Sequence, residues 1–588
     1  MSKQDLTTIR HSASHVLAQA VLALYPKAKL GIGPAIEEGF YYDFDLGEDS
    51  FSESDLEKIE AKMKEIIKEN QRFERYEVEA QKAIKYIKAK NQPYKLELAE
   101  ELVKGGEKNL TFYRMVAKKD EKRFVDLCAG PHVESTKEIG AIKLLKIAGA
   151  YWRGSEKNKM LQRIYGTAFI QKAELNQYLE RIAEAERRDH RKLGKELDLF
   201  VFSDLVGPGL PMYTFKGAVV RREIVNYSNE LQKSIGYQEV HTPNINKAEL
   251  FKVSGHYEKY KSDMLKVSSN YSKEEYYLKP MNCPQHTQIY AAKHHSYKDL
   301  PIRIADFANL YRDEKPGELS GLTRLRCFCQ DDGHAFCRPD QIREEFENVL
   351  KIIRQALTTY KMEYYVRFST WDTNHQEKYL GDKATWELAQ TKLKEILIDN
   401  KIEYQDGVGE AAIYGPKMDF ISRDSLGREW QISTIQLDFI MPERFGLKYI
   451  DQEGNEKTPV MIHRAIVGSP ERFMGILIEH YGGAFPAWLS PQQVQIAPVA
   501  QDFIEAAKEL ADEFSRAGIR VWLDDANETV GSKIRKAEKL KIPYMIVFGQ
   551  KEVEGGDLQV RLRGQKDNLT ISKADFIERI VKEIRERL

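Results

Sequence analysis

The sequence predicts an α/β protein of several domains, and three observations carry that prediction. Its 588 residues and 42% hydrophobic content suffice for roughly three to five domains with their own cores. The stretch 302–337 has two apolar segments around a charged, Gly- and Pro-containing middle, which is the pattern of an antiparallel strand–loop–strand unit. Residues 490–588 alternate short apolar strands with amphipathic helices, as α/β domains do.

Composition restricts the class of protein. Lys+Arg and Asp+Glu both total 90, so a nucleic-acid partner requires local basic patches rather than a basic chain. The five cysteines form an odd, sparse set, which favours a reducing compartment over a disulfide framework. The N-terminus lacks an apolar signal core, and no apolar run approaches the ~20 residues that span a bilayer. We therefore expect a cytoplasmic protein.

Residues 1–171 are expected to form the first domain. Thr7 or Thr8 can cap a helix that carries His11 and His15, four residues apart and hence on one face. Further along, a strand from Phe124 runs into a tight turn that contains Cys128 and His132. Because Ser12 stands where a metalloprotease helix has its Glu, that class is disfavoured. Metal binding, a core role and catalysis all stay open for these four side chains.

Residues 172–198 are strongly charged and are expected to form one helix that links two domains. A solvated spacer and a helix that contacts RNA are both consistent with this composition.

The region 199–489 is expected to be the largest domain. Arg312 and Arg324 lie near the inner ends of its strand–loop–strand unit, and the planar fork of arginine suits phosphate oxygens. Gln330, Asp331, Asp332, Gly333 and His334 follow, a cluster able to bind an amino group or a metal ion. The residues alone therefore indicate a nucleotide site beside a site for a small polar molecule.

These segments resemble class II aminoacyl-tRNA synthetases, with 302–337 matching motif 2. The MNCP sequence at 281–284, the QDDGH sequence at 330–334 and the HRAI sequence at 463–466 resemble the threonyl-tRNA synthetases of the bacterial type in particular. The resemblance covers the chain from about residue 8 to the end. It implies an antiparallel-sheet catalytic domain at 199–489, an α+β editing domain at 1–171 and an α/β anticodon-binding domain at 490–588.

The resemblance implies roles in activating threonine with ATP and Mg²⁺. Arg312 would bind the α-phosphate, Glu314 would contact the adenine amino group, and Phe328 would stack on the adenine. Arg324 and, in a GSPER sequence that resembles motif 3, Arg472 would bind phosphates. Gln431 is implied in the ATP site, and His256 is implied in accepting a proton from the tRNA ribose.

Cys283, His334 and His463 are too far apart to predict a metal site by spacing, but the resemblance implies that they hold one Zn²⁺. Beside it, the resemblance implies a set of threonine-binding residues: Gln330, Asp332, Tyr414, Lys417 and Gln436. A site that binds the threonine hydroxyl rejects valine, whereas one missing methyl costs serine only ~1–3 kcal/mol. Serine is therefore expected to be activated in error, which explains why an editing domain accompanies this site.

The resemblance also implies the site that hydrolyses Ser-tRNA(Thr). Its residues would be His11, His15, Tyr42, Lys95, Asp126, Cys128 and His132. In the last domain, Asn527, Glu552 and Arg561 would contact the anticodon of tRNA(Thr), and Lys533, Arg535, Lys536 and Lys539 form a basic helix face.

Two further expectations follow from the resemblance. The helix from about Lys216 to Gln232, with the strand that ends at Pro243, resembles motif 1 and implies a homodimer. Members usually begin with a small ubiquitin-like domain, which is expected to be missing because Met1 lies only ten residues before His11.

Three rival functions are weighed against a threonine–tRNA ligase. A stand-alone deacylase is disfavoured by the intact ATP motifs from Arg312 to Arg472. A non-catalytic RNA-binding regulator would have lost one of those arginines or a zinc ligand. Another class II specificity is disfavoured by the set Cys283, His334 and His463.

Overall fold

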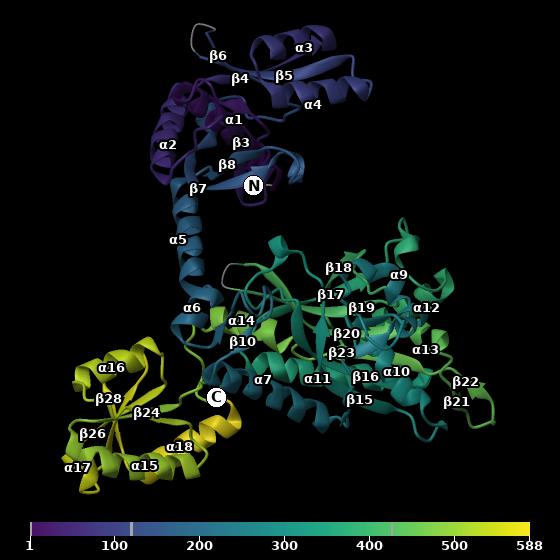
Figure 1. Cartoon of the computed structure of the whole chain (residues 1–588), viewed down its shortest axis with the longest axis vertical. Coiled ribbons are helices and arrows are strands. Elements are labelled where there is room, and N and C mark those ends of the chain that lie inside the picture. Colours follow the sequence, from purple (N-terminus) through teal and green to yellow (C-terminus); the bar gives the residue numbers. More distant parts are fainter. Residues whose placement is uncertain (1–2, 118–120, 425–426) are drawn as a thin grey trace. The chain divides into compact units, whose positions relative to one another are not determined.

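The computed structural model describes residues 3–117, 121–424 and 427–588, and the chain divides into two compact units, 1–183 and 184–588. Figure 1 labels the elements of both units.

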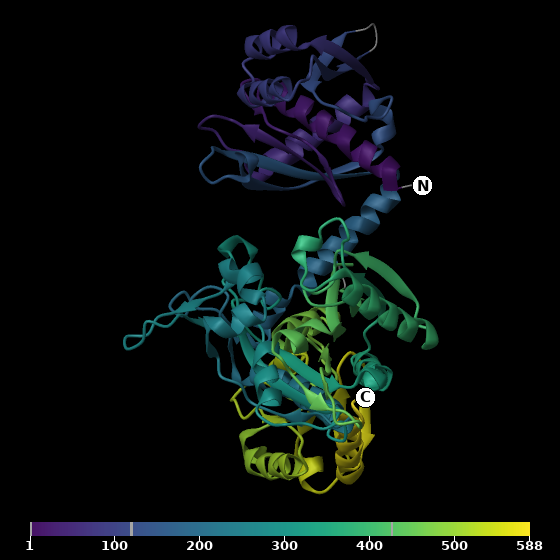
Figure 2. The same ribbon diagram turned by 90° about the vertical axis from the view of Figure 1, so that its right-hand side faces the viewer.

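The first unit contains two antiparallel sheets. One has the order β1-β3-β8-β7, with β2 paired to β3; its strands are β1 (Lys29–Leu30), β2 (Ala35–Ile36), β3 (Gly39–Asp45), β7 (Ala141–Tyr151) and β8 (Met160–Phe169). Helices α1 (Lys3–Leu24) and α2 (Glu53–Lys68) pack on it (Figure 1, Figure 2). The other sheet is β4 (Arg72–Glu79), β5 (Asn109–Val116) and β6 (Lys122–Leu127), with α3 (Ala80–Ala89) and α4 (Pro93–Lys104) beside it. The expected α+β domain is confirmed.

Two sequence-based boundaries in this region are wrong. Helix α1 begins at Lys3, so Thr7 and Thr8 lie inside it rather than capping it. The single helix expected at 172–198 is broken in two, α5 (Lys172–Arg188) and α6 (His190–Glu196). Asp189 is the reason for the break, because its carboxylate accepts a hydrogen bond from the backbone N–H of Arg191 at 2.7 Å and so caps a new helix.

An eight-stranded sheet forms the centre of the second unit, in the order β11-β15-β16-β23-β20-β19-β17-β18. Its strands are β11 (Gln238–Glu239), β15 (Ile302–Tyr311), β16 (Cys327–Cys337), β17 (Tyr364–Thr370), β18 (Tyr404–Val408), β19 (Lys417–Arg423), β20 (Glu429–Asp438) and β23 (Val460–Ala465). Only the two edge pairs, β11 with β15 and β17 with β18, are parallel. The predicted antiparallel strand–loop–strand unit is β15 and β16, which pair along their length from Ile302 opposite Phe336 to Tyr311 opposite Cys327.

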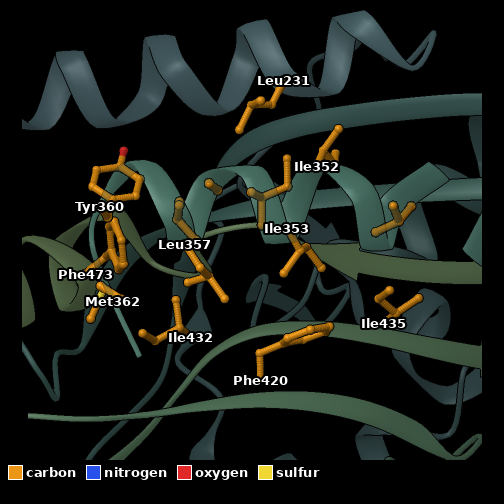
Figure 3. Packing of buried hydrophobic residues seen from close by; sticks show 14 of the residues in the cluster. Leu231, Ile352, Ile353, Leu357, Tyr360, Met362, Phe420, Ile432, Ile435 and Phe473 are labelled. Atoms are coloured by element: carbon orange, nitrogen blue, oxygen red, sulfur yellow. The ribbon is translucent and has the colours of Figure 1, made fainter. Parts of the chain in front are cut away.

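Helices bury one face of this sheet. Helix α11 (Ile342–Thr359) lies between the sheet and α7 (Phe215–Ser234), and α14 (Pro470–His480) packs on both α7 and β16. Figure 3 shows Ile353 and Leu357 of α11 between Leu231 of α7 and Phe420 and Ile435 of the sheet. Side chains alternate between the two faces of a strand, so the residues between these core positions point to the opposite face. That opposite face carries the candidate site.

The last part of the chain is a mixed five-stranded sheet in the order β25-β24-β26-β27-β28. Strands β24 (Val494–Pro498), β25 (Val521–Leu523), β26 (Tyr544–Phe548) and β27 (Leu558–Leu562) match the prediction, and β28 (Asn568–Ile571) is additional. Helices α15 (Ile504–Arg516), α16 (Val530–Lys539), α17 (Gln550–Val553) and α18 (Lys573–Glu586) complete the α/β fold.

The basic face expected on α16 is smaller than the sequence suggests. Lys533 is buried, and its Nζ donates to the carbonyl of Pro498 at 3.1 Å. Lys536 pairs with Glu528 at 2.7 Å. Only part of the predicted charge is therefore available on the surface.

Among the described residues, no helix has the length and apolar character needed to cross a membrane.

Candidate active site

Strand register gathers four of the predicted residues into one row. His334 lies opposite His463, His463 opposite Gln436, and Gln436 opposite Lys417, across the adjacent strands β16, β23, β20 and β19. Residues that face each other on neighbouring strands have Cβ atoms only ~5 Å apart. Positions separated by up to 129 residues in the chain therefore become neighbours.

A cavity of about 280 Å³ lies over this row, and we call it the histidine pocket. Its lining includes all three predicted metal ligands and all five predicted threonine-binding residues: Cys283, His334, His463, Gln330, Asp332, Tyr414, Lys417 and Gln436. Tyr414 stacks on His463 with ring centroids 4.4 Å apart and donates a hydrogen bond to Oε1 of Gln436 at 2.8 Å. Lys417 pairs with the buried carboxylate of Asp419 at 2.9 Å.

Cys283, His334 and His463 fit a tetrahedral metal ion. Their ligand atoms lie within 4.8 Å of one another and all three residues are buried. Nε2 of His334 is 3.0 Å from Nδ1 of His463, near the roughly 3.3 Å that separates two nitrogens on tetrahedral zinc. Burial raises the pKa of the Cys283 thiol well above its usual value, so a thiolate there requires a cation beside it.

Neighbouring polar groups orient the two histidines. Oδ2 of Asp438 accepts a hydrogen bond from Nε2–H of His463 at 2.9 Å, which leaves Nδ1 facing the ligand position. Nδ1 of His286 is 2.7 Å from Nδ1 of His334. Burial raises the pKa of Asp332 to about 7, so a cationic group beside it would favour the charged carboxylate.

A second cavity of about 270 Å³ adjoins the first, and we call it the arginine pocket. It is lined by every predicted ATP-binding residue: Arg312, Glu314, Arg324, Phe328, Gln431 and Arg472. The guanidinium carbon of Arg312 lies 5.1 Å from the centre of the Phe328 ring. Burial, followed by the charges of Arg312 and Arg324, lowers the pKa of Arg472, so the pocket concentrates positive charge that an anion would neutralise.

The two pockets share part of their lining. Arg312, Gln330, Thr434 and Ala465 line both of them. A guanidinium at the junction can contact an anion in one pocket and a carboxylate in the other. The geometry therefore suits a reaction between the two occupants.

His256 is close to the histidine pocket but does not line it. Its ring lies 6.4 Å from that of Tyr414 and 6.2 Å from that of Tyr260, and both tyrosines do line the pocket. Nδ1 of His256 is 2.8 Å from the Ser254 hydroxyl. Its buried Nε2 has no hydrogen-bond partner among the described residues.

The first unit brings the seven predicted editing residues into one cluster. Cys128 Sγ lies 3.4 Å from Nε2 of both His11 and His132. Asp126 forms the other half of the cluster: it accepts from Tyr42 at 2.6 Å and from Lys95 at 2.7 Å, and His15 lies 3.8 Å from it. The structure thus joins Lys95, from α4, to residues of α1, β3 and β6.

Burial sets the charge state of this cluster. It lowers the pKa of His11, His15 and His132, and it raises the pKa of the Cys128 thiol to about 11. The three rings are therefore neutral at neutral pH, and the thiol is protonated. Neutral imidazoles beside a lysine ammonium can accept a proton from water and donate to an oxyanion.

Asn527, Glu552 and Arg561 are not joined to one another by any hydrogen bond or ion pair among the described residues. Asn527 is exposed after β25, and Glu552 caps α17 by accepting from Gly549 N–H at 2.9 Å. Arg561 lies on β27, 3.7 Å from Glu538.

Sequence reasoning missed the residues that support these pockets. Asp438 and His286 contact the two histidines that are predicted to bind a metal ion, as described above. Glu471 accepts from the backbone N–H of Cys329 and from Nε of Arg221, both at 2.9 Å, so it ties α7 and α14 to the strand that carries Phe328. The local sequence holds no signal for these contacts, because each partner lies in a distant segment.

Three family models match separate parts of the chain. The family model "tRNA synthetase class II core domain (G, H, P, S and T)" matches residues 260–481, "Anticodon binding domain" matches 493–583, and "Threonyl and Alanyl tRNA synthetase second additional domain" matches 110–165.

Two relatives and one solved structure illustrate the similarity. The threonine–tRNA ligases of Thermotoga neapolitana and Clostridium tetani are each 48% identical to this chain, over 98% and 99% of it and 88% of each relative. The crystal structure of the RNA binding domain of threonyl-tRNA synthetase from Cryptosporidium parvum superposes with a TM-score of 0.64 at 36% identity. That match covers 67% of this chain and 98% of the other.

Proposed function

This chain belongs to the threonyl-tRNA synthetase family, and from that premise we propose that it activates L-threonine with ATP, transfers it to the 3′ end of tRNA(Thr) and hydrolyses mischarged Ser-tRNA(Thr). The proposal assigns editing to residues 1–171, a linker to 172–198, catalysis to 199–489 and anticodon binding to 490–588.

The observation that carries the proposal is the position of Arg312 in the lining of both pockets. ATP would occupy the arginine pocket with its α-phosphate at Arg312, where charge develops as the threonine carboxylate attacks. Phe328 would stack on the adenine and Glu314 would accept from its amino group. Arg324, Arg472 and Gln431 would bind the rest of the nucleotide, which enters with Mg²⁺. Such a reaction depends mainly on positioning and charge neutralisation.

Threonine would occupy the histidine pocket. Gln330 and Asp332 would orient its ammonium group, and Tyr414, Lys417 and Gln436 would line the rest of its site. Cys283, His334 and His463 would hold Zn²⁺, which would supply a Lewis-acid contact for the amino group and hydroxyl of threonine. Valine lacks the hydroxyl and would lose that contact.

In the transfer step, His256 would accept the proton of the tRNA ribose. This role is supported by the buried Nε2 of His256, which lacks a hydrogen-bond partner among the described residues. The ring lies next to Tyr414, which lines the pocket. Burial lowers the pKa of His256 to about 3, so the ring is neutral and its Nε2 carries an unprotonated lone pair when Nδ1 holds the proton.

Editing would use the cluster in the first unit. Lys95, held by Asp126, would donate to the oxyanion that forms when water attacks the serine ester, and neutral His11, His15 or His132 would accept the water proton. Tyr42 would hold the second oxygen of Asp126 and Cys128 would fix the spacing of His11 and His132.

The proposal also covers partners and compartment. Asn527, Glu552 and Arg561 would contact the tRNA anticodon. Apolar side chains exposed just before and at the start of α7 favour a homodimer: Val201, Phe202, Leu205, Val206 and Phe215. The five free cysteines favour the reducing cytoplasm.

The deciding experiment is amino-acid-dependent ATP–pyrophosphate exchange with threonine, serine and valine on zinc-loaded enzyme. We expect serine to be about 10–200-fold poorer than threonine in kcat/KM, and valine poorer by about 10⁴-fold or more. Equal rates with threonine and valine, or no exchange at all, would refute the assignment of the two pockets.

A further inference from the structure

His190 occupies an unexpected position for a residue of a charged linker. It is the first residue of α6, yet only 3% of it is exposed. Its ring contacts two segments far away in the sequence: Nδ1 lies 2.7 Å from Oε1 of Glu479, and Nε2 lies 3.0 Å from the backbone nitrogen of Leu322.

These two contacts define the proton on the ring. A backbone N–H can only donate, so Nε2 must be the acceptor for Leu322. Nδ1 then carries the proton of the neutral imidazole and donates it to Glu479. One tautomer thus satisfies both bonds.

Asp189, His190 and Glu479 bring three metal-ligand side chains together, but their hydrogen bonds argue against a metal site. Both ring nitrogens of His190 are in use. The carboxylate of Asp189 accepts from the backbone N–H and Nε of Arg191 at 2.7 and 3.0 Å. These partners explain the cluster without an ion.

The contact with Leu322 holds the loop between β15 and β16. Leu322, Thr323 and Arg324 of this loop all line the arginine pocket. Arg472 donates from Nε to the carbonyl of Thr323 at 3.0 Å, so the loop also touches a second arginine of that pocket. A shift of Leu322 would therefore move two guanidinium groups relative to each other.

The loop backbone is shaped to fit the ring. Gly321, next to Leu322, has φ +47°, and a Cβ at that position would lie only 2.1 Å from Nε2 of His190. Only glycine permits this close approach and this conformation.

Glu479 gives the ring a fixed reference on α14. Its other oxygen accepts from Nη2 of Arg428 at 2.7 Å, and the residue is buried. Because α14 also carries Arg472, the chain Glu479–His190–Leu322 ties the loop to the same helix that supplies the second arginine.

We propose that His190 is a positioning residue for ATP: its Nε2 holds the loop at Leu322 so that Arg324 and the Thr323–Arg472 contact are placed for the phosphates. This inference rests on the proposed function, because it takes the arginine pocket to be the ATP site. His190 lines neither pocket, so its effect would pass through the loop.

Two substitutions test the roles of the two ring nitrogens of His190 separately. His190→Gln places an amide oxygen near the position of Nε2, where it can accept from Leu322, whereas His190→Asn places its amide near Nδ1 and leaves the Leu322 N–H without a partner. In threonine-dependent exchange we expect His190→Asn to raise the KM for ATP about 5- to 100-fold with the KM for threonine unchanged. His190→Gln should stay within about threefold of wild type.

The outcomes are distinguishable. Wild-type KM values in both variants, or equal rises for ATP and threonine in both, would overturn the inference. Wild-type enzyme without threonine-dependent exchange would instead refute the proposed function. If His190→Asn fails to fold, Gly321→Ala decides: a rise in the KM for ATP alone supports the inference, and an unchanged KM overturns it.

Discussion

His463 donates its Nε2 proton to Asp438 across 2.9 Å, deep under the histidine pocket. Asp438 is fully buried, and its other oxygen accepts from the backbone N–H groups of Ile440 and Met441 at 2.7 and 2.9 Å. The carboxylate is thus held by the start of a helix while it selects which nitrogen of His463 faces the ligand position.

Asp438→Asn tests whether this contact supports zinc binding. The asparagine can keep the helix contacts through its oxygen but turns an N–H₂ group toward Nε2, so we expect zinc affinity to fall about 10–100-fold. Competition with a chromogenic chelator measures the change. Asp451→Asn, a half-buried aspartate with comparable backbone contacts that lines neither pocket, is the control and should keep the wild-type affinity. Unaltered affinity in Asp438→Asn would mean that the carboxylate does not orient a ligand.

Phe328→Ala tests the adenine contact. Loss of one stacked base costs about 1–3 kcal/mol, so the KM for ATP should rise about 5- to 150-fold while the KM for threonine stays near wild type. Steady-state exchange at varied ATP measures it. Tyr271→Ala removes an exposed aromatic ring outside both pockets and should leave both constants unchanged. A rise in the threonine constant alone would contradict the assignment.

Asp126→Asn tests the editing cluster. The substitution removes the charge that holds Lys95, so we expect hydrolysis of Ser-tRNA(Thr) to fall by about 100-fold or more with threonine activation unchanged. Deacylation of preformed Ser-tRNA measures this directly. Asp43→Asn is a matched control, because Asp43 also forms a buried ion pair in this unit, with Arg163 at 2.6 Å. Equal losses in both variants would point to general destabilisation instead of editing chemistry.

The buried histidines of this cluster should make the first unit sensitive to acid. Burial lowers the pKa of His11, His15 and His132 below 6.5 in the folded chain, so below that pH the unfolded chain binds protons that the folded chain does not. Stability is therefore expected to fall as the pH drops below 6.5, with a slope that approaches about 4 kcal/mol per pH unit for the three residues. Calorimetric melting between pH 7.5 and 5.5 measures the slope.

Two variants check the origin of this slope. His132→Asn should flatten it by about a third, because one of the three groups no longer titrates. His375→Asn, in which the replaced side chain is 53% exposed, should leave it unchanged. Identical slopes in wild type and His132→Asn would assign the acid sensitivity to other groups.

The local sequence was enough to predict the elements that carry the site. The antiparallel pair β15 and β16, with site residues on alternate positions of β16, follows from apolar segments around a polar loop and from the period of two in a strand. The resemblance supplied the candidate residues, and the two pockets and the cluster in the first unit collect most of them. His256 is one exception, since it lies beside its pocket and not in the lining. The anticodon candidates Asn527, Glu552 and Arg561 are the others, since no contact among the described residues joins them.

Only the tertiary structure decided which residues support those groups. Asp438 beneath His463, Asp126 between Tyr42 and Lys95, and His190 under Leu322 join segments that are far apart in the chain. The break at Asp189, which frees His190 to start a new helix, was also invisible in the helical pattern of 172–198. The physical reason is that a motif or a periodic pattern predicts only how residues close together in one helix or strand are arranged. The partner of a buried polar atom depends on strand register and helix packing across the whole fold.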